Sequence, residues 1–221
     1  MLRSSLVAML LLGTSLYATQ PTKENVAKLY VATFERAPDS AGLDYWVNTD
    51  LELEEIAQSF FDQPETQTKY PTGTSNAAFI TSVYENLFNR APDAAGLAYW
   101  DGELQRGVFT KSEFILAAIN GAQNTAEGND LAMVENKTEV GLAFADAGFD
   151  SVADAKNYLA NVTDDDATVA AALASFYSKA PVAHPTRTQA QLDAATVLSG
   201  DITSSMTLTS DKVYRISGTT K

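Results

Sequence analysis

The sequence predicts an all-α protein, in which a duplicated unit with three helices per copy is followed by further helices and by the start of a β region. Three observations support this fold class. Apolar residues recur at helical spacing through most of the chain, one stretch recurs 54 residues further on, and after Ala194 the composition changes to Thr, Val, Ile and Ser.

The first 18 residues have the order of a secretory signal peptide. Arg3 gives a basic start, residues 6–12 form a short apolar run, and small and polar residues lead to Ala18. A membrane anchor is the alternative, but this run is well short of the about 20 apolar residues that span a bilayer. We therefore expect export, with cleavage after Ala18, and a location at the bacterial cell surface or outside the cell.

An internal repeat organises residues 19–121, which we expect to form one helical domain. Positions 30–46 align with positions 84–100, and 11 of these 17 positions are identical. The identical positions include the pattern Arg-Ala-Pro-Asp-x-Ala-Gly-Leu-x-Tyr-Trp. The motif residues that we single out are Arg36, Pro38, Asp39, Gly42, Tyr45 and Trp46 in the first copy, and Arg90, Pro92, Asp93, Gly96, Tyr99 and Trp100 in the second.

The motif predicts a helix, a break and a second helix in each copy. A helix with apolar residues every four positions ends before the proline, which disfavours helical backbone in the residue that precedes it. The aspartate that follows is placed to cap the next helix, and the glycine inside that helix suggests close approach of another helix. A third helix is expected over 51–61 in the first copy and over 110–119 in the second.

Helical spacing continues without the repeat over residues 122–178. We expect helices at 129–145, at 151–159, and from 163 or 164 to 177, as an extension of the same domain. Residues 179–193 are polar, contain two prolines and predict a linker. Residues 194–221 predict the start of a truncated β domain, with two short strands within 206–217 around a Ser-Asp turn; a complete protein with a frayed C-terminus is the alternative.

The repeated motif resembles the tandem bacterial domain-of-unknown-function family 4214, whose helical fold is similar to the phycobilisome linker domain. The resemblance is strong over about residues 22–121 and loose over 122–178. It implies the N-terminal part of an exported surface-layer-like or adhesin-like protein. The expected partners are then an envelope polysaccharide or neighbouring surface-protein subunits, and the family offers no agreed catalytic residues.

Composition excludes several kinds of chemistry. The chain has no Cys and a single His, so thiol catalysis, disulfides and multi-His metal sites are absent from the sequence. Its formal net charge of −13 disfavours contact with nucleic acid. We expect no cofactor, with calcium as the one candidate ion, and a non-catalytic anchoring or assembly module.

Three groups of polar residues have a functional and a structural interpretation. The two motif arginines could hold an acidic sugar beside the Tyr-Trp pair, or could pair with the Asp three residues on or with carbonyl groups at the end of a helix. Three consecutive acids (Asp164, Asp165 and Asp166) could bind a cation, or could mark the start of a helix. Glu54 with Glu55, or Asp101 with Glu103, could serve a carboxylate-dependent carbohydrate-active enzyme, the alternative function. We favour the structural interpretation of each group.

Overall fold

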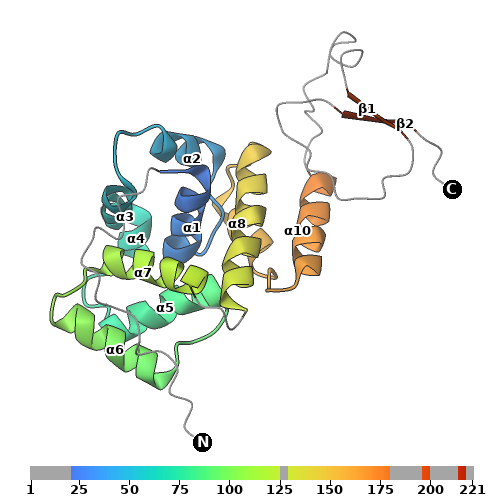
Figure 1. Ribbon diagram of the computed structural model, residues 1–221. Coiled ribbons are helices and arrows are strands. Elements are labelled where there is room, and N and C mark those ends of the chain that lie inside the picture. The colour runs from blue at the N-terminus through green and yellow to red at the C-terminus, as the bar shows by residue number, and fades with distance from the viewer. Residues whose placement is uncertain (1–20, 125–128, 180–195, 200–213, 218–221) are drawn as a thin grey trace, which may run out of the picture. The chain divides into compact units, whose positions relative to one another are not determined.

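A computed structural model of the chain describes residues 21–124, 129–179, 196–199 and 214–217 (Figure 1). The chain divides into two compact units, Met1–Lys179 and Ala180–Lys221, and each is described by itself. The described part of the first unit is all-helical and contains ten helices, which confirms the predicted helical class. The predicted signal peptide (1–18), the linker beyond Lys179 and most of the predicted β region lie outside the described residues.

The first copy of the repeat contains four helices rather than three. The first three occur close to where the sequence predicts them, and a fourth, very short helix was not predicted. Their bounds are α1 (Lys23–Phe34), α2 (Ser40–Val47), α3 (Leu53–Phe61) and α4 (Pro64–Lys69). Helix α4 has one buried residue, Thr66, so no apolar spacing marks it in the sequence.

The second copy contains three helices, and three more complete the unit. The second helix of this copy is longer than its counterpart α2 by one turn. The bounds are α5 (Asn76–Phe88), α6 (Ala94–Gln105), α7 (Lys111–Asn124), α8 (Asp130–Asp146), α9 (Val152–Leu159) and α10 (Asp166–Lys179). The helices predicted at 129–145 and 151–159 therefore form within one or two residues of their expected ends.

Helix α1 lies at the centre of the helical unit. All nine residues from Val26 to Phe34 are buried, and the helix packs against α2, α5, α7 and α8 (Figure 1). The surrounding core is rich in aromatic rings that are almost fully buried: Phe60, Phe79, Phe114, Phe144 and Phe176. Because α1 has neighbours on several sides, only its first turn needs to be polar.

The second helix of each motif copy, α2 or α6, begins as predicted. The helix before it, α1 or α5, ends in a way that was not predicted. Asp39 and Asp93 are the N-caps of α2 and α6, and each carboxylate accepts a hydrogen bond from the backbone N–H of the glycine three residues on, at 2.8 and 2.7 Å. Helices α1 and α5 end at Phe34 and Phe88, four residues before the prolines, and the C-cap residues that follow, Glu35 and Asn89, have left-handed backbone with φ of 60° and 53°. A left-handed residue thus ends each helix before the proline can act.

The second unit contains two described strands of four residues, β1 (Thr196–Ser199) and β2 (Tyr214–Ser217). They pair in parallel, with Thr196 opposite Tyr214 and Ser199 opposite Ser217. The second predicted strand therefore includes β2, but its described partner is a parallel strand from further upstream. The first arm of the predicted hairpin lies outside the described residues, and a β domain beginning here stays a prediction.

Candidate functional site

The arginine of the first motif copy is buried in a network of charged and aromatic groups. Arg36 is 6% exposed, and its Nε and Nη2 donate hydrogen bonds to the two carboxylate oxygens of Glu65, both at 2.8 Å. Nη1 donates to the carbonyl of Ala37 at 2.9 Å and lies 3.6 Å from an oxygen of Asp39. The guanidinium lies 5.0 Å from the centre of the Tyr30 ring. Arg36 therefore holds the start of α4 against the end of α1.

The arginine of the second copy pairs with an acid, a backbone carbonyl and a tyrosine ring in the same way, but at the surface. Arg90 donates from Nε and Nη2 to the carboxylate of Asp130, at 3.0 and 2.5 Å, and from Nη1 to the carbonyl of Ala91 at 3.2 Å. Its guanidinium lies 5.6 Å from the centre of the Tyr84 ring. The side chain is 47% exposed, so its ion pair is screened by water.

The acidic partners of the two arginines were missed by the sequence analysis. Glu65 is in the first turn of α4 and Asp130 is in the first turn of α8, where a negative charge also suits the helix dipole. The predicted pairing with the Asp three residues on is a secondary contact for Arg36. The run Gln63-Pro64-Glu65 has a proline and an acid at the start of a helix, and this signal could have indicated α4.

The two glycines of the motif have different surroundings. A Cβ on Gly42 would lie 2.5 Å from the Tyr30 hydroxyl, so α2 approaches α1 as closely as glycine allows. The three atoms nearest to a Cβ on Gly96 all belong to the Asp93 carboxylate group, at 3.4 Å or more. The predicted close approach of another helix is thus found in the first copy, and at Gly96 the nearest described neighbour is the residue that caps its own helix.

The first copy is also covered by later helices, and the second is more exposed. Ala37 is fully buried: its N–H donates to the Ala155 carbonyl at 3.2 Å, and a Cβ on Gly141 would lie 3.4 Å from the Pro38 ring. In the second copy, Ala91 is exposed. One sequence motif therefore occupies a buried and an exposed environment.

The Tyr-Trp pair separates into a packed ring and an exposed ring. Trp46 is 8% exposed and its ring centre lies 5.2 Å from that of Phe60, whereas Trp100 is half-buried against Phe114. The adjacent tyrosines, Tyr45 and Tyr99, are 63% and 48% exposed. Each lies edge-on to its own tryptophan, with ring centres 4.9 and 5.1 Å apart. The tyrosines are therefore the aromatic motif residues that face solvent.

A cavity of about 240 Å³ lies beside the first motif and opens to solvent. Its walls come from α1, α2 and α3 and from the start of α4. The lining residues are Tyr30, Phe34, Arg36, Trp46, Phe60, Gln63, Pro64 and Glu65. Burial, and to a lesser degree the nearby Asp39 carboxylate, raises the pKa of Tyr30 to about 12, so its hydroxyl is protonated at neutral pH.

A second polar cluster is buried between α5 and α8. Lys137 is 3% exposed, and its ammonium donates to the Asn86 carbonyl at 2.6 Å and to the Asn89 side-chain oxygen at 2.5 Å. Burial lowers the pKa of Lys137 to about 8, with Glu35 acting in the opposite direction. Asn89 in turn donates to the Val162 carbonyl at 2.9 Å. The cluster joins the end of α5 to α8 and to the segment after α9.

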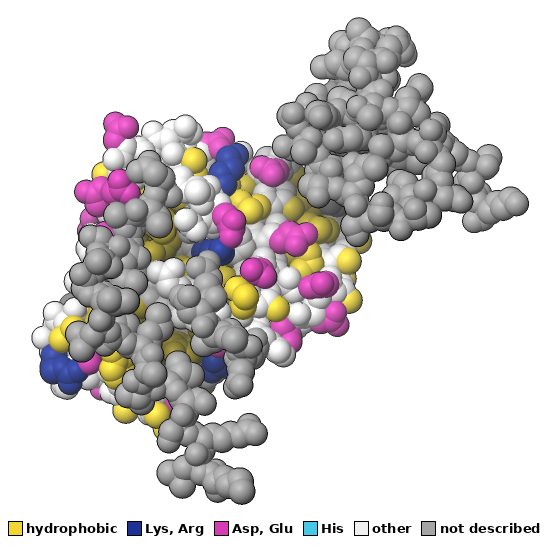
Figure 2. All heavy atoms as spheres, in the orientation of Figure 1, with side chains coloured by type: hydrophobic (Ala, Val, Ile, Leu, Met, Phe, Trp, Pro, Cys, Tyr) yellow, Lys and Arg dark blue, Asp and Glu magenta, His cyan; other side chains and the backbone are white. Residues whose placement is uncertain are grey.

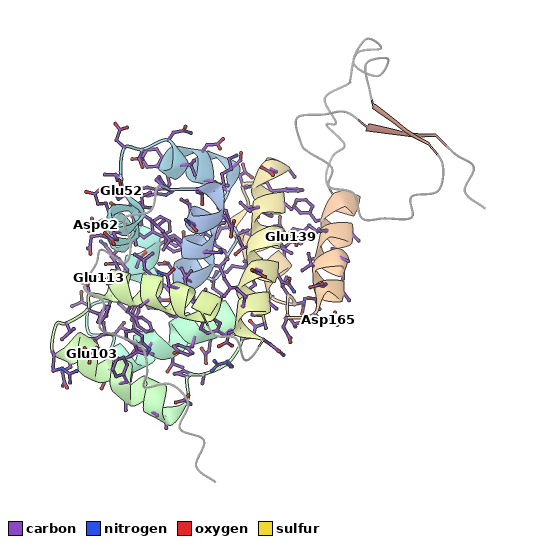
Figure 3. The ribbon with its side chains drawn as sticks, viewed as in Figure 1. Glu52, Asp62, Glu103, Glu113, Glu139 and Asp165 are labelled. Atoms are coloured by element: carbon purple, nitrogen blue, oxygen red, sulfur yellow. The ribbon has the colours of Figure 1, made fainter. Side chains whose placement is uncertain are left out.

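The candidate cation ligands Asp164, Asp165 and Asp166 lie at the start of α10. The Asp165 carboxylate accepts a hydrogen bond from the Ala167 N–H at 2.9 Å, and Asp166 accepts one from the Asn136 side chain at 3.5 Å. Within the described ranges, no three His, Cys, Asp or Glu side chains are grouped in a way that could hold a metal ion. The six acids labelled in Figure 3 come from five different helices or their ends, α3, α6, α7, α8 and α10.

The carboxylate pairs considered for catalysis lie away from the cavity, and neither contributes to its lining. The Glu55 carboxylate accepts a hydrogen bond from the Glu52 N–H at 2.9 Å, as part of a capping box at the start of α3. Glu103 is 8% exposed and forms an ion pair with Arg106. Burial raises the pKa of Glu54, and Glu113 and Glu52 contribute in the same direction.

The surface of the helical unit is acidic. Figure 2 shows Asp and Glu side chains spread over the visible face, with few Lys and Arg between them. No helix in the described part of the chain has the length and apolar character that crossing a bilayer requires.

Comparisons with known proteins give one match. No curated protein and no solved structure matches the chain. The matching family model begins inside α3 and includes the second motif copy, at 84–100, while the first copy precedes the matched residues. Residues 57–127 are thus similar to the family described as Domain of unknown function (DUF4214), which supports the family resemblance over this part of the chain.

Proposed function

We propose that residues 19–178 are a non-catalytic anchoring or assembly module of an exported bacterial cell-surface protein, and that they bind an envelope glycan or a neighbouring subunit. In this proposal the module is a tandem, phycobilisome-linker-like helical domain at the N-terminal end of a surface-layer-like or adhesin-like protein. A β region follows it.

The observation that supports binding is the exposure of the same tyrosine in both copies. The arginine and aspartate of each motif copy are used in ion pairs and helix caps. Tyr45 and Tyr99 instead present large aromatic rings to solvent, at equivalent positions 54 residues apart. Rings of this kind suit stacking against sugars or packing against protein, because one end is apolar and the hydroxyl remains hydrated.

Calcium is part of this proposal because of the negative net charge of the chain, and not because of a defined calcium site. A chain with a net charge of −13 and an acidic visible face repels an anionic envelope at contact, where screening is weakest. Divalent cations shared between carboxylates and envelope phosphates would offset this repulsion. We expect envelope binding in calcium and release in a chelator.

The anchoring function is tested with a deletion variant that lacks residues 19–178 and keeps the signal peptide. The protein should then be secreted into the medium, whereas the parent stays on the cells. Retention of the deletion variant at parental level would contradict anchoring, and release of reducing sugar from envelope polysaccharide by the purified parent would contradict the non-catalytic assignment.

The role of the tyrosines is tested in the full chain with the double variant Tyr45→Ala, Tyr99→Ala. Binding to purified envelope fragments should fall about tenfold or more, with little change in thermal melting, because both rings are exposed. Val152→Ala is the matched control, since Val152 is 49% exposed on α9 and lies outside the motif. Equal binding by the double variant and the control would show that the tyrosines are not the binding residues.

A further inference from the structure

Helix α6 presents one side to solvent. It packs against α5 and α7, whereas its counterpart in the first copy, α2, packs against α1 and the long helix α8 (Figure 1). The apolar residues Leu97, Trp100 and Leu104 face the core from the inner side of α6. We call the exposed residues of this helix and its C-cap the outer face: Ala94, Ala95, Ala98, Tyr99, Gln105 and Arg106.

The outer face is less polar than the corresponding positions of the first copy. Ser40 and Asp44 on α2 align with Ala94 and Ala98 on α6. Asp44 is exposed and forms an ion pair with Lys23 at 3.2 Å, as suits a position in contact with water. The solvent side of a surface helix normally carries polar residues. The copy that is more exposed has alanine at these positions, which is the reverse of what contact with water favours.

Two large hydrophobic residues are exposed at α6. Tyr99 is 48% exposed and Val108 is 57% exposed, and they are two of the four large hydrophobic residues that the described part of the chain exposes in this way. Val108 follows the helix, and its N–H donates to the Glu103 carbonyl at 3.0 Å, while the Gly107 N–H donates to the Leu104 carbonyl at 3.2 Å. These bonds fix Val108 at the C-terminal end of α6. Exposed apolar residues that lie together are typical of a contact with another protein.

The charge of the outer face suits an acidic partner. Arg106 is the one charged residue among its six members; its side chain is 62% exposed and is paired with Glu103. The chain as a whole has a formal net charge of −13, and Asp and Glu side chains are spread over its visible face (Figure 2). A basic partner would find no carboxylate among the six residues, whereas a second, equally acidic copy of the chain meets less repulsion here than at an acidic surface.

The two ends of α6 carry opposite charges. Asp93 is the exposed N-cap and Arg106 is the exposed C-cap, 13 residues later, so the charges are about 20 Å apart along the helix. When two such helices lie antiparallel, each Arg106 lies near the Asp93 of the other copy. The midpoint of this arrangement falls at Tyr99, where the ring of each copy can pack on the small side chains Ala95 and Ala98 of the other.

We propose that two copies of this chain associate through the outer face of α6, with the two helices antiparallel around a two-fold axis close to Ala98. The proposal rests on the proposed function, since it names the contact with a neighbouring subunit. A contact made by one 12-residue helix is at the lower end of interface sizes, so the dimer forms reversibly and at high protein concentration. Tyr45 lies on α2, beside the charged Asp44, and stays outside this contact.

Sedimentation equilibrium of the full chain, after removal of the predicted signal peptide, tests the association. The parent should show a concentration-dependent monomer–dimer equilibrium. Ala98→Asp should weaken it by about tenfold or more, because it places two carboxylates near the two-fold axis. Ala41→Asp is the matched control: it makes the same change at an exposed alanine of α2, and should leave the equilibrium unchanged. Both alanines are exposed, so both variants should keep the parental melting temperature.

Cross-linking tests the position of the axis. The chain has no Cys, so a single introduced thiol reports one position. Ala98→Cys should form a disulfide-linked dimer under mild oxidation, because a nearby two-fold axis brings the two Cα atoms within the about 4.4–6.8 Å that a disulfide spans. Asp44→Cys places the thiol at the same repeat position of α2 and should remain monomeric under the same conditions.

Three results would overturn the dimer contact. They are a parent that stays monomeric at every concentration, equal effects of Ala98→Asp and Ala41→Asp, and equal cross-linking of Ala98→Cys and Asp44→Cys. Loss of envelope binding by Ala98→Asp from a monomeric parent would show that this face contacts the envelope instead.

Failure of the dimer contact is distinguishable from failure of the proposed function. If the parent is monomeric while the 19–178 deletion variant is shed from cells, the α6 contact is wrong and anchoring stands. If the parent dimerises through α6 while the deletion variant stays on cells at parental level, anchoring is wrong and the α6 contact stands.

Discussion

Substitution of the two motif glycines by alanine should change stability in opposite directions. In both helices the glycine is the third residue, where alanine gains up to about 1 kcal/mol of helix propensity. At Gly96 this gain should be realised, because the nearest atom to the new Cβ is 3.4 Å away and belongs to an exposed side chain. At Gly42 the new Cβ would be 2.5 Å from the Tyr30 hydroxyl, a contact that must be relieved by movement.

The cost at Gly42 follows from how firmly Tyr30 is held. Its side chain is 4% exposed, its ring packs against Phe34 and Phe60, and its hydroxyl interacts with Trp46. Overpacking of such a site costs about 1–3 kcal/mol, which exceeds the gain in propensity. We expect Gly42→Ala to lower the free energy of unfolding and Gly96→Ala to raise it, with a difference between the two variants of about 1–3 kcal/mol.

Urea unfolding followed by circular dichroism measures both variants. The mechanism is isolated by repeating Gly42→Ala in a Tyr30→Phe background, which removes the hydroxyl that the Cβ would meet. There the alanine should cost less than in the parent, because only the contacts with the two Asp39 carboxylate oxygens, at 3.1 Å, remain, so the double-mutant cycle should show a coupling between the two sites. Equal effects of the two glycine substitutions, or a coupling near zero, would refute the close-approach explanation.

Three further predictions concern burial. Trp46→Ala should cost about 3–5 kcal/mol and Trp100→Ala clearly less, because Trp46 is 8% exposed whereas Trp100 is only half-buried; equal losses in calorimetry of the two variants would contradict this. Because the pKa of Lys137 is about 8 when folded and near 10.5 when unfolded, the unfolded state binds more protons between these values, so the free energy of unfolding should rise from pH 8 to pH 10. Above pH 10 Tyr30 acts in the opposite sense, since its folded pKa is about 12. The rise should be absent in Lys137→Met. Thr33→Val should raise stability by about 1 kcal/mol in urea unfolding, because the Thr33 hydroxyl is buried and has no described hydrogen-bond partner, and a loss of stability would contradict this.

The sequence predicted the features of the fold that depend on a few neighbouring residues. The caps Asp39 and Asp93 were predicted because a cap needs only a short polar side chain before a helix. The helices expected over 51–61 and 110–119 were predicted from apolar spacing, and the structure buries Ile56 of α3 and Phe114 of α7 fully.

The candidate site could not be predicted because its contacts join distant parts of the chain. Glu65 is 29 residues from Arg36, and Asp130 is 40 residues from Arg90, so local spacing contains no sign of either pair. The opposite environments of the two copies were equally hidden, because their motifs are nearly identical in sequence. The first copy is buried by residues from outside the repeat: Gly141 on α8 and Ala155 on α9 contact it.

The two copies of the repeat are buried to different extents, and this difference affects which helices unfold locally first. Helix α6 has one buried residue among its 12, Glu103, whereas α1 has nine. The apolar residues by which α6 contacts the core, Leu97, Trp100 and Leu104, are only partly buried, so this helix should open in local excursions at a free energy below that of global unfolding. Amide protons of α6 should therefore exchange with solvent long before those of α1. Helix α6 is then a separately adjustable part of the domain, able to loosen and re-form while the central helix keeps the rest folded.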